Sequence, residues 1–405
     1  MPWSKAVIAS LASALAATVV LSACQLGNDP NAIKIYSSMP RTGASKGLTD
    51  SITNGIKMAF DEAGNKVGTY NLRYEDLDDA TAAKGNWDAA KEADNANRAV
   101  NDAQVMAYIG TFNSGAASVS IPILCKANLA MISPANTYPG LTKPGKGEAD
   151  EPDKFYQGCQ RNYVRVIPAD DLQGVAGANW ARQAGLTRVY VLDDTELYGH
   201  GIASVFVDQA RKIGLEVVGG PEGIDPKASD YRAIAEKIRG TNPQLIYFGG
   251  VTANNAGKLA QDLKAAMPNV RFMGPDGVYD QAFLQAAGAA SEGAMLTFGG
   301  LPAPKLTGKG ADFYTNYKDK FKAEPESYAA YGYEAARVVL TALNQVGRPD
   351  RAAIRDAIFG TRNFDGVLGS WSFDQNGDTT LTTLSGREAK AGKYDEANAV
   401  VLQGS

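Results

Sequence analysis

The sequence predicts an α/β protein made of two doubly wound lobes, each a parallel β-sheet covered by helices on both faces. From residue 32 onwards, short apolar runs rich in β-formers alternate with longer helical runs. This alternation restarts near residue 168, and the 405-residue chain is longer than one ordinary domain of roughly 100 to 200 residues. Repeated strand–helix–strand units form right-handed crossovers, and these produce parallel sheets.

The first series of elements supplies the first lobe. Strands are predicted at 32–39, 70–77, 105–110 and 129–134, with helices at 49–64, 87–102 and 118–128. The Gly-, Pro- and Lys-rich stretch 138–158 that follows is predicted to be a surface loop.

The second series and the tail supply the rest. Strands are predicted at 161–168, 188–194, 216–220, 245–250 and 270–277, with helices at 171–185, 201–214, 231–240 and 256–267. From residue 294 the chain offers helices near 312–323 and 326–347 and a hairpin-like stretch at 371–378. Because this tail is too short for a third α/β domain, we expect it to complete the other two lobes.

The N-terminal segment has the pattern of an export signal. Lys5 is followed by a run of apolar and small residues that ends in the tetrad LSAC at Cys24. That tetrad resembles the lipobox of bacterial lipoproteins, so we predict a signal peptide at 1–23, a lipid anchor on Cys24 and a tether at 24–31. An ordinary signal peptide with a coincidental cysteine is the alternative, and length alone leaves a membrane helix open.

The predicted export signal bears on the state of the two remaining cysteines. Cys125 and Cys159 form an even pair in an oxidising compartment, which favours a disulfide. Two buried free thiols are the alternative.

Composition argues against several functions. Forty Lys and Arg against 44 Asp and Glu give a net charge of −4, which does not suit a nucleic-acid surface. The single histidine, His200, argues against a Ser-His-Asp triad and a His-ligated metal centre. The chain also lacks the Walker pattern. His200 lies in a Tyr-Gly-His-Gly loop and does not stand beside a serine and an acid in any recognisable order. We therefore expect no enzyme, no metal and no cofactor.

Polar residues follow the first-lobe strands, where ligands of parallel sheets lie. Asn113 and Ser114 come directly after strand 105–110 and open a helix, so that free N–H groups and a hydroxyl form an anion cradle there. Ala135 and Thr137 follow the next strand at the same edge. No Lys or Arg stands in the first turn, which favours a carboxylate over a phosphate. The alternative is that Asn113 and Ser114 merely cap the helix.

The sharpest polar residue of the second lobe is Asp276, in the Pro-Gly turn after the apolar run VRFM. A carboxylate here, opposite an anion cradle on the other lobe, suits a zwitterion whose carboxylate and ammonium need opposite partners. Asp276 in isolation also reads as a plain turn aspartate.

Together these motifs resemble the branched-chain amino-acid periplasmic binding proteins, the type I solute-binding lipoproteins of ABC importers. The similarity runs along nearly the whole mature chain and is carried, in the family's order, by YIGTFNSGAA, AMISPANTYPGLT, RVIPADDLQG, LYGHG, LIYFGG and FMGPDGV.

The resemblance implies a role for each site residue. Ser114, Thr137 and the backbone of Ala135 would hold the ligand carboxylate, and Asp276 would hold the ammonium. Tyr198 would line the cleft.

Other positions follow from the same resemblance. Asp170 matches the aspartate of the interlobe crossover. Leu48 and Val251 stand where family members often carry aromatic residues, which implies a smaller or more aliphatic pocket. Tyr328 and its neighbours Tyr331 and Tyr333 have helical spacing typical of a core, so we leave them out of the site.

The resemblance also implies the lobe boundaries and the function. Lobe one would comprise 32–168 and 299–365, and lobe two 169–298 and 366–405, with crossings near 167–170, 297–299 and 364–366. The expected function is an extracytoplasmic lipoprotein that captures a small amino acid by hinge closure and delivers it to an ABC importer permease. A sensory receptor subunit and a binder of small amides or other metabolites remain alternatives, and an exported hydrolase is disfavoured.

Overall fold

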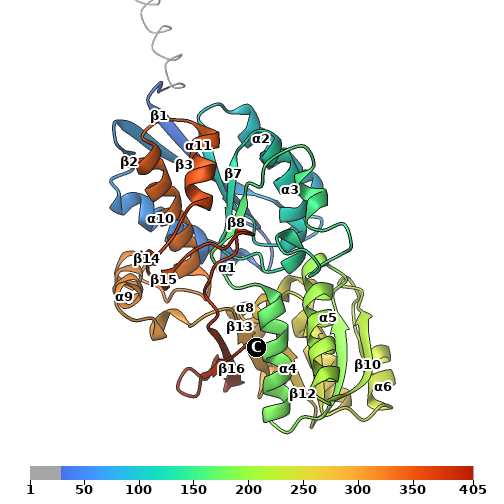
Figure 1. Cartoon of the computed structure of the whole chain (residues 1–405). Helices are drawn as coiled ribbons and strands as arrows, with labels where there is room; N and C mark the ends of the chain where they lie inside the picture. The colour runs from blue at the N-terminus through green and yellow to red at the C-terminus, as the bar shows by residue number, and fades with distance from the viewer. Residues whose placement is uncertain (1–28, 405) are drawn as a thin grey trace, which may run out of the picture.

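The computed structural model describes residues 29–404 and shows two α/β lobes, one above the other in Figure 1. Each lobe contains one large sheet. The predicted signal peptide and Cys24 lie outside the described residues. The expected fold class is confirmed.

The first sheet has the strand order β2-β3-β1-β6-β7-β8. Its strands are β1 (Ala32–Met39), β2 (Lys66–Val67), β3 (Tyr70–Asp78), β6 (Val105–Gly110), β7 (Ala130–Ser133) and β8 (Tyr163–Arg165). All pair in parallel except β2, which runs antiparallel to β3. Every residue of β6 is buried, as expected for an apolar central strand covered on both faces.

Helices cover this sheet on both sides. They are α1 (Lys46–Glu62), α2 (Ala89–Asn101), α3 (Ser114–Lys126), α10 (Ala329–Val346) and α11 (Arg351–Phe359). Helix α1 packs against α10 and α2 against α3. The helix starts follow simple capping chemistry: the Asp88 side chain accepts from two N–H groups of α2, and Asp350 accepts from one of α11. Smaller elements of this region are β4 (Ala80–Thr81), β5 (Asn86–Trp87) and α9 (Lys309–Phe321).

The second sheet has the order β10-β9-β11-β12-β13-β16-β17, and β18 also pairs with β16. Its strands are β9 (Arg188–Asp193), β10 (Glu216–Gly223), β11 (Leu245–Gly249), β12 (Arg271–Gly274), β13 (Met295–Phe298), β16 (Leu384–Lys390), β17 (Lys393–Tyr394) and β18 (Val400–Leu402). The surrounding helices are α4 (Asp170–Gln183), α5 (Leu197–Lys212), α6 (Arg232–Arg239), α7 (Ala256–Ala266) and α8 (Gln281–Ala287).

The C-terminal strands were not predicted. Strand β16 pairs antiparallel with β13, so the second sheet has a parallel body and an antiparallel edge. The run LSGREAK has no strong β pattern, and its strand conformation depends on the free edge that β13 offers.

The third crossing between the lobes is placed later than the sequence predicted. Residues 364–371 form the hairpin β14 (Phe364–Gly366) and β15 (Gly369–Trp371), and Glu334 of α10 accepts from Val367 N at 3.0 Å and Trp371 Nε1 at 2.7 Å. The hairpin therefore packs on the first lobe. Its N–H groups donate hydrogen bonds to the buried Glu334 carboxylate, which would otherwise be unsatisfied. The chain joins the second sheet only at Leu384, so the expectation near 364–366 is wrong at this crossing. The remaining lobe boundaries stay a prediction.

The stretch 138–158 is only partly a surface loop. Tyr138, Leu141, Phe155 and Tyr156 are buried in a hydrophobic cluster of the first lobe, and short 3-10 turns form at η1 (Pro139–Leu141) and η2 (Asp153–Tyr156). Residues 144–150 are exposed. The aromatic and aliphatic side chains fold the two ends of this stretch inward, leaving its charged middle in solvent.

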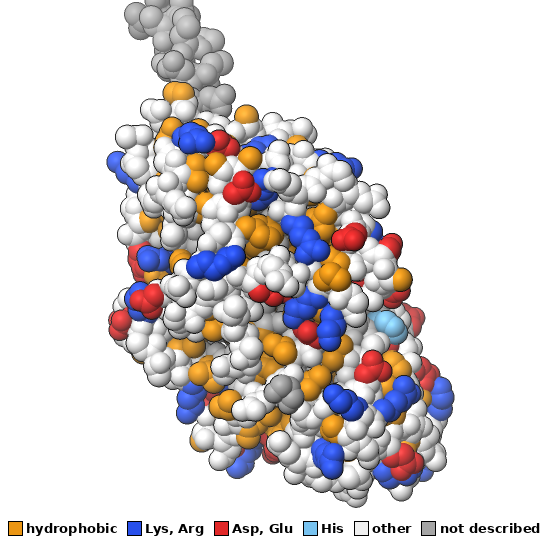
Figure 2. All heavy atoms as spheres, viewed as in Figure 1, with side chains coloured by type: hydrophobic (Ala, Val, Ile, Leu, Met, Phe, Trp, Pro, Cys, Tyr) orange, Lys and Arg blue, Asp and Glu red, His pale blue; other side chains and the backbone are white. Residues whose placement is uncertain are grey.

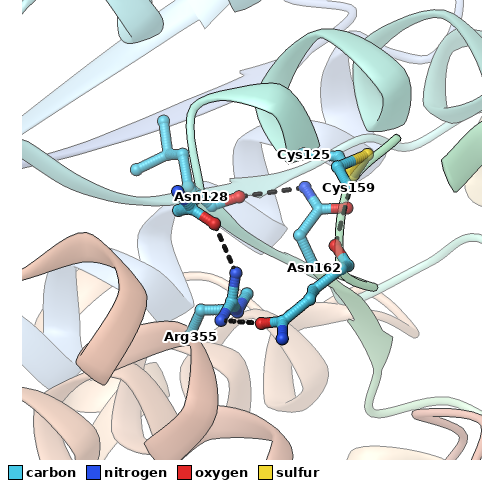
Figure 3. Close-up of a disulfide and its surroundings, with 7 residues drawn as sticks. Cys125, Asn128, Cys159, Asn162 and Arg355 are labelled. Atoms are coloured by element: carbon cyan, nitrogen blue, oxygen red, sulfur yellow. Dashed lines mark hydrogen bonds between the residues drawn. A yellow bond between two sulfur atoms is a disulfide. The ribbon is translucent and has the colours of Figure 1, made fainter. Parts of the chain in front are cut away.

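The predicted disulfide is confirmed. Cys125, near the end of α3, bonds Cys159, with 5.9 Å between the Cα atoms (Figure 3). Beside it, Arg355 of α11 donates to Asn128 Oδ1 at 2.6 Å and to Gln160. The disulfide thus ties the stretch before β8 to the sheet's covering helices.

No helix among residues 29–404 is long and apolar enough to cross a membrane. No group of three or more His, Cys, Asp or Glu side chains there is arranged to hold a metal ion. On the face shown in Figure 2, basic and acidic side chains are interspersed.

Candidate functional site

A buried cavity lies between the lobes, where the carboxyl ends of the two sheets meet. Its free volume is about 10 Å³, roughly the space of one water molecule, so the lobes are nearly closed on each other here. In each sheet the first five parallel strands follow the order 2-1-3-4-5, whose reversal point is the usual ligand position in open α/β sheets. The lining residues are Phe112, Asn113, Ser114, Ala135, Thr137, Tyr198, Val251, Asp276, Gly277 and Tyr328.

The start of α3 forms the first part of the cavity wall. Asn113 occupies the N-cap position, but its side chain makes no capping hydrogen bond. The first N–H groups of α3 are therefore available at the cavity, at the positive end of the helix dipole. Ser114 Oγ accepts from Tyr138 N at 3.3 Å, which leaves the hydroxyl hydrogen of Ser114 free to donate.

The turn after β7 forms the second part. Ser133 Oγ accepts from the N–H groups of Ala135 at 3.1 Å and Asn136 at 2.8 Å. The Thr137 carbonyl accepts from Asp170 N at 2.9 Å. The backbone N–H of Ala135 is thus already engaged, so its carbonyl is the backbone group that it can offer a ligand.

Arg165 holds this turn from behind. Its buried guanidinium donates to the carbonyls of Asn136 at 3.3 Å and Tyr138 at 2.8 Å, and it pairs with Asp378 at 2.5 Å. These contacts engage the carbonyl oxygens of Asn136 and Tyr138 and leave that of Ala135 free. A pair buried so deeply acts to fix geometry, because desolvation offsets much of the Coulomb attraction.

Asp276 provides the second-lobe wall. It is 1% exposed and accepts from Gln173 Nε2 at 3.0 Å, from the Tyr198 hydroxyl at 2.5 Å and from the Tyr328 hydroxyl. Burial raises the pKa of Asp276, and the hydrogen bonds from Tyr198, Tyr328 and Gln173 oppose that rise.

Asp170 adds a second buried carboxyl beside this wall. Burial raises the pKa of Asp170 well above its usual value, and the charge of Asp276 adds to the effect. No Lys, Arg or His is among the cavity-lining residues of the described chain. The second-lobe side is therefore a place for a cation.

The matching family model is described as periplasmic binding protein and covers residues 32–393. The chain belongs to the periplasmic binding protein family. Its membership places the protein outside the cytoplasm and among solute-binding proteins, which are not enzymes.

Relatives of this periplasmic binding protein are similar along most of their length. Leu/Ile/Val-binding protein homolog 2 of Brucella abortus is 28% identical over 369 residues, covering 90% of this chain and 92% of the relative. The leucine-, isoleucine-, valine-, threonine- and alanine-binding protein of Pseudomonas aeruginosa is 28% identical, covering 85% and 87%. A leucine-binding protein of Thermotoga maritima has a TM-score of 0.79 at 25% identity, covering 91% and 98%. The resemblance seen in the sequence is confirmed.

The cavity of this binding protein includes most of the predicted site residues but not all of them. Asp170 lies behind the lining, where its N–H bonds Thr137. Leu48 is 3% exposed in α1 and packs in the hydrophobic core, so it does not line the cavity. Val251 lines it, held by its N–H bond of 3.1 Å to the buried Asp194.

Tyr328, Phe112 and Gln173 are site residues that sequence reasoning missed. Tyr328 stands just before α10, with its ring edge-on to Phe112 at 5.8 Å between centroids. Tyr328 packs in the hydrophobic core, as its spacing predicted, but its hydroxyl also donates to Asp276 and its side chain lines the cavity. Gln173 carries no local signal: the packing of α4 against β13 brings its side chain to Asp276.

Proposed function

We propose that this protein is an extracytoplasmic amino-acid receptor that captures a small zwitterion between its lobes and delivers it to the permease of an ABC importer. The observation that carries the proposal is the division of polar groups across the cavity. The first lobe presents hydrogen-bond donors without a basic side chain, and the second presents buried carboxyls. The names of the relatives, which bind leucine, isoleucine, valine, threonine or alanine, support the same ligand class.

In this proposal the ligand carboxylate lies at the start of α3. The α3 N–H groups, the Ser114 hydroxyl and Thr137 would donate to it, and a single negative charge suits a cradle of neutral donors. The ammonium would bind the Asp276 carboxylate and the Ala135 carbonyl. This reverses the expected role of Ala135, whose N–H is engaged by Ser133.

Closure of the lobes follows from the same arrangement. A ligand selects the closed state only through contacts that the open state lacks, and here its two charged groups touch different lobes. Direct hydrogen bonds and an ion pair also join the lobes. Among them are Tyr328 to Asp276, Asn86 Nδ2 to Asn254 Oδ1 at 3.1 Å and Lys143 Nζ to Asp171 Oδ1 at 2.8 Å.

Membrane attachment is the remaining part of the proposal. Lipid on Cys24 would tether the soluble body through residues 24–31 and keep it close to the permease. Labelling with a fatty-acid analogue in cells should mark the wild-type chain, while Cys24→Ser should abolish the label. An unlabelled wild type would contradict the anchor and leave the binding function standing.

The ligand class is tested with matched analogues. We expect the purified mature protein to bind a small amino acid in calorimetry. Its amide, which lacks the carboxylate, and its deaminated acid, which lacks the ammonium, should each bind at least about 30-fold more weakly, because truncating a buried charge partner costs about 2–5 kcal/mol. Equal binding of either analogue would contradict zwitterion recognition.

A further inference from the structure

Asn113 lines the cavity, and its side-chain oxygen accepts no hydrogen bond from residues 29–404. It is 7% exposed, stands at the N-cap of α3 and makes no capping hydrogen bond. Its Oδ1 atom is buried without a hydrogen-bond partner among residues 29–404. An acceptor left so in a folded protein is unfavourable unless something else donates to it, and Asn113 lines the cavity in which a ligand would lie.

The donors around Asn113 are already committed. Asn136 Nδ2 donates to Thr111 Oγ1 at 3.3 Å and to the Phe112 carbonyl at 3.0 Å. The Thr111 hydroxyl donates to the backbone carbonyl of Asn113 at 2.7 Å, not to its side chain. Tyr138 N donates to Ser114 Oγ. The Asn113 side-chain oxygen therefore receives no hydrogen bond from these donors of the first-lobe wall.

The ligand ammonium is a poor partner for this oxygen. Asn113 adjoins the start of α3, where the helix dipole is positive and disfavours a cation. Asp276, which lines the cavity on the second-lobe side, offers the ammonium a carboxylate. A neutral hydroxyl or amide N–H suits Asn113 better than a charged group.

We propose that Asn113 is a specificity-determining residue that accepts a hydrogen bond from a hydroxyl or amide on the ligand's side chain. The preferred ligands are then small amino acids with polar side chains rather than aliphatic ones of equal size. This inference rests on the proposed amino-acid binding and names the substrate class within it. Phe112, Val251 and Tyr328 complete the lining with apolar contacts, so one polar contact decides between isosteres.

Threonine and valine test the inference, because they share shape and differ by a hydroxyl in place of a methyl. We expect the wild type to bind threonine at least about ten-fold more tightly than valine in calorimetry, as a site built for a hydroxyl rejects the analogue that lacks it. Asn113→Leu should bring that ratio to one or below. Asn113→Asp keeps an acceptor and should retain the preference for threonine. The exposed Asn97→Leu serves as the matched control and should leave both affinities unchanged.

Each outcome has a meaning. Equal or tighter binding of valine by the wild type overturns the inference and leaves amino-acid binding intact, and this measurement needs no variant to fold. An unchanged ratio in a folded Asn113→Leu also overturns it. If the wild type binds no amino acid at all, the proposed function fails, and the inference fails with it.

Discussion

The two walls of the cavity differ in what they offer a ligand. The first-lobe wall offers neutral donors: the start of α3, the Ser114 hydroxyl and Thr137. The second-lobe wall offers Asp276, a carboxylate that accepts hydrogen bonds. Neither wall alone complements a zwitterion, so affinity depends on bringing them together. The difference explains why two lobes are needed for one small molecule.

The two walls also differ in how they are held. Behind the first wall, the Arg165–Asp378 pair fixes the turn that carries Ala135 and Thr137, and the disulfide fixes its flank. On the second wall, Asp276 is held by the hydroxyl groups of Tyr198 and Tyr328, and Tyr328 belongs to the first lobe. The first wall is therefore built within one lobe, while the second is completed only on closure.

The strongest test of this contrast removes the second wall's charge. We expect Asp276→Ala and Asp276→Asn to lower amino-acid affinity by at least about 30-fold in calorimetry, because loss of a buried charge partner costs about 2–5 kcal/mol. Circular dichroism should show an unchanged fold. The control Asp319→Ala removes an exposed carboxylate and should bind normally. Unaltered affinity in Asp276→Ala would remove Asp276 from the site.

Removing the disulfide tests how the first wall is held. The Cys125→Ser/Cys159→Ser variant should lose about 2–4 kcal/mol of unfolding free energy, since the bond closes a 34-residue separation. Denaturant titration measures the loss, and reducing the wild type should reproduce it. Ligand affinity should change by only a few-fold because neither cysteine lines the cavity. A large affinity loss at unchanged stability would show that the disulfide positions the cradle directly.

Trimming the first wall should weaken binding without a change of charge. Ser114→Ala removes a hydroxyl donor to the ligand carboxylate, and a hydrogen bond to a charged group contributes about 1.5–3 kcal/mol. Calorimetry should show an affinity loss of roughly ten-fold or more. Ser118→Ala, one turn further along α3, bonds only the Gly115 carbonyl and should bind like the wild type. Equal affinities for the two variants would argue that the carboxylate lies elsewhere.

The pH dependence of ligand affinity distinguishes the charged second-lobe wall from the neutral first-lobe wall. The pKa of Asp276 is raised by burial above its usual range, and the ligand ammonium pairs with the ionised carboxylate. Affinity should therefore be constant near neutral pH, below the pH at which the ligand's ammonium deprotonates. It should fall as the pH drops through the raised pKa of Asp276, by up to about ten-fold per pH unit. The fall should begin above about pH 4, where an ordinary aspartate starts to protonate. Ser114→Ala should keep this profile, and a flat profile in the wild type would contradict the role of Asp276.

Residues whose meaning is local were predicted well. Strand 105–110 agrees with β6 because a run that is apolar on both faces suits a central parallel strand. Ser114, Thr137 and Asp276 were found because polar residues just after such strands lie at one edge of the sheet. The disulfide followed from the export signal and an even cysteine pair.

Residues whose meaning depends on distant partners were not predicted. Tyr328 is 52 positions from Asp276 in the sequence, and Gln173 is 103 positions from it, yet both donate hydrogen bonds to Asp276. The later third crossing depends on Glu334, a buried carboxylate that takes its donors from the hairpin at 364–371. No spacing in the chain encodes these contacts.

The sequence alone determined the two-lobe α/β architecture, the export signal pattern and the polar residues at the strand ends, because hydrophobic periodicity and turn chemistry act over short distances. The tertiary structure alone decided which of those residues share a cavity, and it left Leu48 in the core. It also showed that Asn113, which by sequence could cap a helix, holds a buried oxygen without a partner. These features depend on packing between the lobes, because a buried polar atom without a hydrogen-bond partner costs free energy.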